Sequence, residues 1–404
     1  MLHGGPTTTG AKTAPSREGL PRTPGVPGLL GYLVGNPALV AALWLLDHLP
    51  WPPRDQMLPP AAPPRRLLVA MIGNLGDAVI ASATLERIAA ATPPTELGLL
   101  VSPAGAALFR NDPRVRHLHV IDHYWLSRAP VSRREKLRRH AITRRAVIRE
   151  LRTVGYDAAV DLYHPFPSIA PVLRAAGIPR RVGYASNGCC RFLTHAEPWL
   201  PADRHVADYQ AALLHFLGIA APDTLPRPAL PALRARSPEP LPARYAVLHT
   251  GAGAPTREWP EERWLEVARS LAARGLPVLL TGRGAREAAR CARIASAVPA
   301  ANLADRLDPA ELRTVLAGAA LLVCLDSFAA HLGSLDAVPS VVLTTGVANP
   351  AHWRPLNDKA VVLYSRTPCL PCYDWRGCPA MACIREVTAT EVLAAADRLL
   401  APTS

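Results

Sequence analysis

The feature that most constrains this chain is an alternation of short apolar runs and helical patterns that occurs twice. It begins at Arg65, fades by Gly218, resumes at Tyr245 and ends in a helix predicted over 388–401. Strands that alternate with helices are typical of parallel sheets covered by helices on both faces. The sequence therefore predicts an α/β fold of two doubly wound, Rossmann-like units that face each other across a cleft.

On this pattern the 404 residues divide into four parts. Residues 1–64 form a proline-rich extension with a short apolar helix, and 65–219 form the first α/β unit. Residues 220–244 are a linker because they hold many prolines and no helical period, and 245–404 form the second unit. Since 49% of the residues are hydrophobic, sizeable cores can form, which excludes wholesale disorder, collagen and a small disulfide scaffold.

An apolar segment in the extension, residues 29–49, is interrupted by Asn36 and Pro37. Asn36 suits a helix N-cap and Pro37 the first helical position, so the continuous helix runs from Ala38 to Leu49. That length is below the ~20 residues needed to span a bilayer. Three interpretations remain open: a helix packed on the folded body, interfacial attachment to a membrane, and a true span.

Positive charge is in excess, with 45 lysines and arginines against 32 acidic residues, a net charge of +13. Such a balance favours anionic partners. Because only 5% of the residues are aromatic, base-stacking platforms are scarce, and we expect no nucleic-acid partner. Residues 128–152 hold ten basic residues and two glutamates. This run is either a solvated helix face or a docking surface for a phosphorylated lipid-linked sugar or an anionic leaflet.

The first predicted strand of the fold ends at a turn that carries Gly73, Gly76 and Asp77. Ligands of such folds bind at the carboxyl ends of parallel strands, and glycines let the backbone approach a ligand closely. The turn lacks the GxGxxG fingerprint, which disfavours a dinucleotide-dependent redox enzyme. Asp77 then has two interpretations, a helix N-cap or a carboxylate that faces the cleft.

Two strand ends in the second unit carry groups suited to phosphate. The small-residue loop 249–260 contains Arg257, which either grips a phosphate bidentately or is an ordinary surface arginine. The strand that ends at Asp326 passes directly into a helix, whose free N–H groups favour an anion. His331 lies one turn into that helix and is either part of this site or a buried structural histidine.

Taken together, these segments resemble glycosyltransferase family 9, the heptosyltransferase family of bacterial glycosyltransferases. Residues 76–85 resemble its N-terminal glycine–aspartate signature, 249–260 its HPGxG…KxWP segment, and 326–332 its D-[TS]-G-x-x-H-L motif. Further matches, in the family's order, are 112–122, 155–162, 282–287 and the cysteines before Ile384. The resemblance covers residues 65–400.

The resemblance implies a GT-B enzyme that moves a heptose or related sugar from a nucleotide sugar, usually ADP-heptose, to a lipopolysaccharide core acceptor. The transfer would invert the anomeric centre and need no metal or other cofactor. Asp77 would be the general base, and Arg257 and the helix beginning at Ser327 would stabilise the departing diphosphate. Glu287 would accept from ribose hydroxyls, while Asp326 and His331 would shape the phosphate pocket. The implied donor-binding residues are Thr250, Gly251, Arg257, Glu287, Asp326, Ser327 and His331, and the acceptor-side residues are Gly76, Asp161 and Ser168.

Two residues depart from the family pattern, since Arg257 replaces the usual lysine and Phe328 replaces a glycine. They keep open a catalytically silent relative that serves as a binding or assembly protein. A second alternative is a protein O-heptosyltransferase that modifies an adhesin or autotransporter. A third is a nucleotide-sugar epimerase on the same fold, which would need no acceptor.

Four of the eight cysteines crowd together near the end of the chain. The spacing of Cys369, Cys372, Cys378 and Cys383 is that of a four-thiolate structural site for zinc or iron, with free or paired thiols as the alternative. The cysteines are not spread as a secreted framework, and no cleavable-looking signal sequence is present. We therefore expect a cytoplasmic protein, with peripheral contact to the inner membrane as an option.

Overall fold

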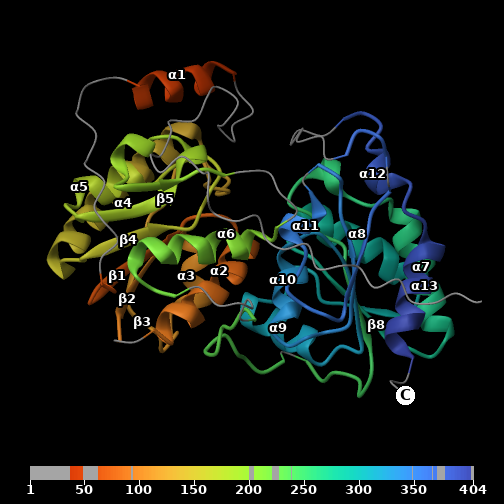
Figure 1. Cartoon of the computed structure of the whole chain (residues 1–404). Helices are drawn as coiled ribbons and strands as arrows, with labels where there is room; N and C mark the ends of the chain where they lie inside the picture. The colour runs from red at the N-terminus through yellow and green to blue at the C-terminus, as the bar shows by residue number, and fades with distance from the viewer. Residues whose placement is uncertain are drawn as a thin grey trace, which may run out of the picture.

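The computed structural model describes residues 37–48, 62–91, 94–199, 204–220, 227–237, 239–347, 349–365, 367–370 and 378–401. Within them the chain forms two parallel sheets of six strands, one in each half of Figure 1. The two sheets confirm the prediction of two doubly wound α/β units.

The first sheet has the strand order β3-β2-β1-β4-β5-β6, and every pairing in it is parallel. Its strands are β1 (Arg66–Met71), β2 (Glu96–Val101), β3 (Val115–Val120), β4 (Ala158–Asp161), β5 (Arg180–Tyr184) and β6 (His195–Glu197). The order reverses between β1 and β4, so the loops after these two strands lie at the switch point where ligands of such sheets bind.

The second sheet repeats this plan with the order β12-β11-β10-β7-β8-β9, again wholly parallel. Its strands are β7 (Ala246–His249), β8 (Val278–Thr281), β9 (Ala300–Asn302), β10 (Leu321–Leu325), β11 (Ser340–Leu343) and β12 (Ala360–Leu363). Here the switch point lies between β7 and β10, the strands that precede the loops singled out in the sequence.

The helices cover both faces of each sheet (Figure 1). The first unit contains α2 (Leu75–Ala89), α3 (Pro103–Phe109), α4 (Arg133–Val154), α5 (Ala170–Ala175) and α6 (Val206–Leu213). The second contains α7 (Glu261–Ala273), α8 (Ala285–Ala297), α9 (Pro309–Ala317), α10 (Phe328–Ser334), α11 (Pro350–Trp353), α12 (Ala382–Arg385) and α13 (Ala389–Leu400). The capping box predicted before α13 is present, because Thr388 Oγ1 accepts from the Glu391 N–H at 3.2 Å and Glu391 accepts from the Thr388 N–H at 2.7 Å.

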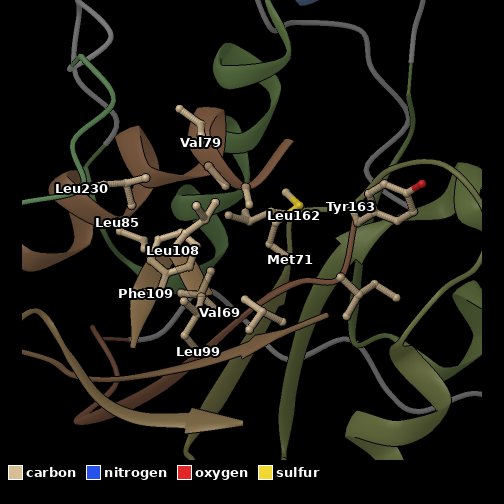
Figure 2. Packing of buried hydrophobic residues seen from close by; sticks show 14 of the residues in the cluster. Val69, Met71, Val79, Leu85, Leu99, Leu108, Phe109, Leu162, Tyr163 and Leu230 are labelled. Atoms are coloured by element: carbon tan, nitrogen blue, oxygen red, sulfur yellow. The ribbon is translucent and has the colours of Figure 1, made fainter. Parts of the chain in front are cut away.

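The apolar runs of β1 and β2 are buried on both sides, as is typical of strands inside parallel sheets. Figure 2 shows how Val69 of β1 and Leu99 of β2 pack beneath helices, with Leu85 of α2 and Phe109 of α3 close by. Full burial of such a side chain stabilises the fold by about 1.5–3 kcal/mol. This packing fixes the position of the turn that follows β1.

The apolar segment of the extension forms α1 (Pro37–His48), which lies over the first unit in Figure 1. Leu43 is buried against Gly188, and the carboxylate of the fully buried Asp47 accepts from the Arg191 N–H at 3.3 Å. In the described ranges we find no helix whose length and apolar character would let it cross a bilayer. The structure therefore shows the helix packed on the folded body, and interfacial attachment to a membrane stays a prediction.

The buried side chain of Arg313 attaches the described part of the predicted linker to the second unit. Arg313 of α9 donates from Nη1 to the carbonyls of Leu230 and Leu233, at 2.6 and 3.2 Å. Its other nitrogens hold Asp336 through two bonds of 2.8 and 2.9 Å. Arg313 thus fixes the path of 227–237 across the second unit.

Replacing Arg313 with alanine should destabilise the protein by ~2–3 kcal/mol, because it leaves a carboxylate and two carbonyls without their buried donor. For a chain of 404 residues the thermal midpoint should fall by ~2–4 °C. Arg269→Ala, on the exposed face of α7, is the matched control and should leave the midpoint nearly unchanged. Equal midpoints for the two variants would show that Arg313 does not hold the linker.

Candidate active site

The two units meet where α2 and α10 begin. A Cβ atom placed on Gly76 would lie only 2.8 Å from Cδ2 of His331, so the two helices approach as closely as a glycine allows. Asp77 follows Gly76, and Asp326 ends β10 just before α10. The contact therefore brings the carboxylates of two distant motifs, one from each unit, to the same place.

Asp77 is not the N-cap of its helix, because that position belongs to Asn74. Instead, Oδ2 of Asp77 accepts from the backbone N–H of Asn74 at 2.8 Å and from its Nδ2 at 3.2 Å. The other oxygen, Oδ1, makes no hydrogen bond within the described part of the chain. One oxygen thus fixes the carboxylate and the other is available to a ligand.

The surroundings of Asp77 raise its pKa to about 6. Burial is the main cause and the negative charge of Asp326 adds to it, whereas the bonds from Asn74 and the positive charge of Arg128 lower the pKa. A carboxylate with this pKa is mostly ionised at neutral pH and still has appreciable proton affinity. These are the properties of a general base.

On the second unit, burial raises the pKa of Asp326 and the neighbouring Arg257 lowers it. His331 lies 4.0 Å from that carboxylate, and burial lowers the pKa of its imidazole to about 4, so the ring is neutral at physiological pH. Within the described chain, His331 Nδ1 and the buried Ser327 Oγ have no hydrogen-bond partner. Buried polar atoms are normally bonded, so these two favour a polar ligand beside Asp326.

Glu287 lies at the carboxyl ends of β7 and β8. Its Oε2 accepts from the Arg283 N–H at 2.7 Å and would lie 2.0 Å from a Cβ atom on Gly251, so a side chain at position 251 would displace this carboxylate. Burial raises the pKa of this carboxyl group. The hydroxyl of Thr250 lies 3.5 Å from Cys291 Sγ, its N–H donates to the Thr281 carbonyl at 3.2 Å, and its carbonyl accepts from Arg290 Nη1 at 2.8 Å. Thr250 is thus engaged with the protein itself.

The predicted acceptor-side residues shape the loop after β4. Asp161 is buried; its Oδ1 accepts from the Tyr163 N–H at 3.1 Å and its Oδ2 from Asn187 Nδ2 at 3.2 Å. Burial raises its pKa to about 7. Ser168 Oγ accepts from the Ala170 N–H at 3.2 Å. Both side chains are thus engaged with the protein itself.

Sequence reasoning missed several residues of this region. Arg128 donates to Asn74 Oδ1 at 2.8 Å, and its Nη2 would lie 3.7 Å from a Cβ atom on Gly253 of the other unit. The ring of Tyr163 would be 2.7 Å from a Cβ atom on Gly73. A pocket beside Asp326 is lined by Thr344, Asn349, Trp353 and Arg354, among others. The only signal for Arg128 was its membership of the basic run, and the others carried none.

Cys372 lies outside the described residues. Cys369 Sγ lies 3.3 Å from Thr367 Oγ1, Cys378 Sγ accepts from the Met381 N–H at 3.2 Å, and Cys383 is buried. Over the described ranges, no group of three or more His, Cys, Asp or Glu side chains is arranged to hold a metal ion. The described cysteines are therefore not gathered into a ligand set, and the four-thiolate site stays a prediction.

Known proteins are similar to this chain in sequence and in fold. Lipopolysaccharide heptosyltransferase 1 of Pseudomonas aeruginosa is 35% identical over 130 residues, a match that spans 32% of this chain and 36% of that protein. The structure of E. coli ADP-heptose lipopolysaccharide heptosyltransferase II superposes with a TM-score of 0.64 at 21% identity, covering 83% of this chain and 98% of the other. The iron-containing dodecameric glycosyltransferase TibC of enterotoxigenic E. coli gives 0.52 at 15% identity, covering 85% and 77%.

The structural matches show a GT-B fold. The model of glycosyltransferase family 9 (heptosyltransferase) matches residues 144–379, which is more than half of the sequence. The chain therefore belongs to glycosyltransferase family 9, the heptosyltransferase family.

Proposed function

We propose that this protein transfers a heptose from a nucleotide-heptose, ADP-heptose, to a lipopolysaccharide core acceptor and inverts the anomeric centre. The observation that carries the proposal is a carboxylate of near-neutral pKa, Asp77, placed where the two units meet. Family membership and the sequence match to a lipopolysaccharide heptosyltransferase support the sugar and the acceptor.

In the proposed reaction, Oδ1 of Asp77 takes the proton of the acceptor hydroxyl as its oxygen attacks the anomeric carbon. The bond from that carbon to the diphosphate breaks, and the nucleoside diphosphate leaves with the electron pair. A single displacement of this kind inverts the anomeric centre. The proton stays on Asp77 until solvent removes it.

The departing diphosphate needs positive charge and hydrogen-bond donors. We infer that Arg257 supplies the charge, since its effect on Asp326 shows that it lies beside that group. Ser327 Oγ and His331 Nδ1 supply polar contacts, because neither has a partner in the described chain. Glu287 would bind the ribose hydroxyls through the oxygen that does not hold Arg283.

Asp77→Asn tests the proposed base. The amide can still accept from the Asn74 N–H and carries no buried charge, so the variant should be at least as stable as the wild type at neutral pH. Turnover should fall ~10²–10⁴-fold, the usual contribution of a general base, while ADP binding measured by calorimetry stays unchanged. A stable variant with full activity would show that Asp77 is structural and refute the mechanism.

The acceptor surface we propose is the outer face of α4. Leu137 and Ile142 are 44% and 51% exposed there, and Trp125 of the preceding loop is 50% exposed. Exposed arginines lie among these apolar side chains. Four of them form no ion pair with a described residue: Arg133, Arg134, Arg145 and Arg149. Unpaired positive charge beside exposed apolar side chains suits a phosphorylated glycolipid.

Reversing three of these charges, Arg134, Arg145 and Arg149 to Glu, should raise the KM for a phosphorylated lipopolysaccharide acceptor and weaken its dependence on salt. The KM for ADP-heptose should not change. The matched control reverses Arg236, Arg269 and Arg398, which lie exposed on the second unit or its linker. If both triple variants have the same acceptor KM, α4 is only a solvated face.

The alternatives lead to different results in the same assays. An epimerase would convert the nucleotide sugar without an acceptor, and a silent relative would release no ADP. The carboxylate of Asp77 has a pKa of about 6, which suits a general base, and this favours an active enzyme over a silent relative. If the acceptor is a protein, the enzyme would glycosylate that protein in place of the lipopolysaccharide core. The phosphate groups of the glycolipid would then have no effect on the acceptor kinetics.

The proposed metal at the cysteine cluster is tested by elemental analysis of the purified protein. A four-thiolate site predicts about one zinc or iron per chain. Cys378→Ser should release the metal and lower the thermal midpoint, whereas Cys189→Ser, far from the cluster in sequence, should do neither. Wild-type protein that is metal-free and equally stable after treatment with a chelator would refute the site.

A further inference from the structure

Arg128 belongs to no motif, yet it lies beside the candidate base. It extends from the segment between β3 and α4, and its Nη2 donates to Asn74 Oδ1 at 2.8 Å. It forms no ion pair with any described residue. An exposed arginine whose charge is unpaired and whose guanidinium holds a side-chain amide is not explained by core packing or by a surface salt bridge.

The amide of Asn74 has two ends with opposite chemistry, and both are used. Its oxygen accepts from Arg128, while its nitrogen donates to Asp77 Oδ2 at 3.2 Å. With the amide rotated by 180°, its NH₂ group would face the donors of the guanidinium and its oxygen would face the carboxylate, so both bonds would be lost. Arg128 therefore determines which end of Asn74 faces Asp77.

We propose that Arg128 is a positioning residue for the base: it orients the Asn74 amide so that Asn74 holds Oδ2 of Asp77 and leaves Oδ1 for the acceptor hydroxyl. The inference rests on the proposed function of Asp77. It adds a relay of two hydrogen bonds, in which Arg128 binds Asn74 and Asn74 binds Asp77. Arg128 and Asp77 lie 51 positions apart in the sequence.

Four groups with titratable or charged side chains face Asp77 from the elements around it. Asp326 raises its pKa from the second unit, and Arg128 lowers it from the first. The hydroxyl of Tyr163 is neutral because burial raises its pKa, and the ring of His331 is neutral because burial lowers its pKa. Only Arg128 among these favours the ionised carboxylate.

The sign of the effect follows from these charges. The base works when ionised, so turnover is lost as pH falls through the pKa of Asp77. Removing Arg128 withdraws a favourable charge and releases the Asn74 amide, and both changes raise that pKa. The acid limb of the pH profile should therefore move to higher pH. The expected shift is ~1 pH unit, the size that loss of one nearby charge produces.

The experiment measures kcat between pH 5 and 9 with ADP-heptose and a heptose-deficient lipopolysaccharide core as substrates. Arg128→Gln should lose ~5-fold in kcat at pH 6 and lie within ~2-fold of the wild type at pH 8.5, as a shift of one unit requires. Asn74→Ala should move the acid limb in the same direction. Arg398→Gln, exposed on α13, is the control and should leave the profile in place.

The double variant Arg128→Gln/Asn74→Ala tests the relay itself. Residues that act through one another are not additive, so its acid limb should move less than the sum of the two single shifts. An equal loss of kcat at every pH, or fully additive shifts, would overturn the relay. If Asp77→Asn is itself fully active, the proposed function fails. If Asp77→Asn is inactive while Arg128→Gln keeps the wild-type profile, only the relay fails.

Discussion

The close approach of Gly76 to His331 is the contact on which the rest of the site depends. Because residue 76 has no side chain, the imidazole of the second unit reaches the first turn of α2. Asp77 is then within electrostatic reach of Asp326, and each carboxylate lies at the carboxyl end of its own sheet. Since burial keeps His331 neutral, it does not cancel the charge of Asp326, and the repulsion helps to keep the pKa of Asp77 high.

The arrangement favours chemistry at the expense of stability. Burial raises the pKa of Asp77 to about 6 and that of Asp161 to about 7, above the value of an aspartate in an unfolded chain. The folded protein therefore binds protons more tightly than the unfolded one. The stability that these two groups contribute is fully present below pH ~4 and is lost as pH rises through their folded pKa values. At neutral pH both carboxylates oppose folding, and the buried strands of the two sheets offset that cost.

Sequence patterns predicted the two units and placed their boundary strands because strand and helix periodicity is local. The motif around Asp77 was found for the same reason, since glycine, acid and helix start are neighbours. The orientation of the Thr250 side chain toward Cys291 was not predictable, because sequence periodicity does not settle which way a single residue just after β7 turns. The contact of Glu287 with Gly251 joins residues 36 positions apart, and only the register of β7 with β8 brings them together.

Arg128 could not be singled out from the sequence either. It also links the proposed base to the proposed acceptor surface. In the sequence it is one of ten basic residues in the run 128–152, and only the structure separates it from the others by its bond to Asn74. The segment that carries it is fixed to α4, because Lys136 Nζ donates to the Ser127 carbonyl at 2.7 Å and His140 packs on the ring of His123. The proposed acceptor surface and the residue proposed to position the base are therefore joined through these contacts. An acceptor that shifts α4 would shift Arg128 with it, and so link acceptor binding to the orientation of Asp77.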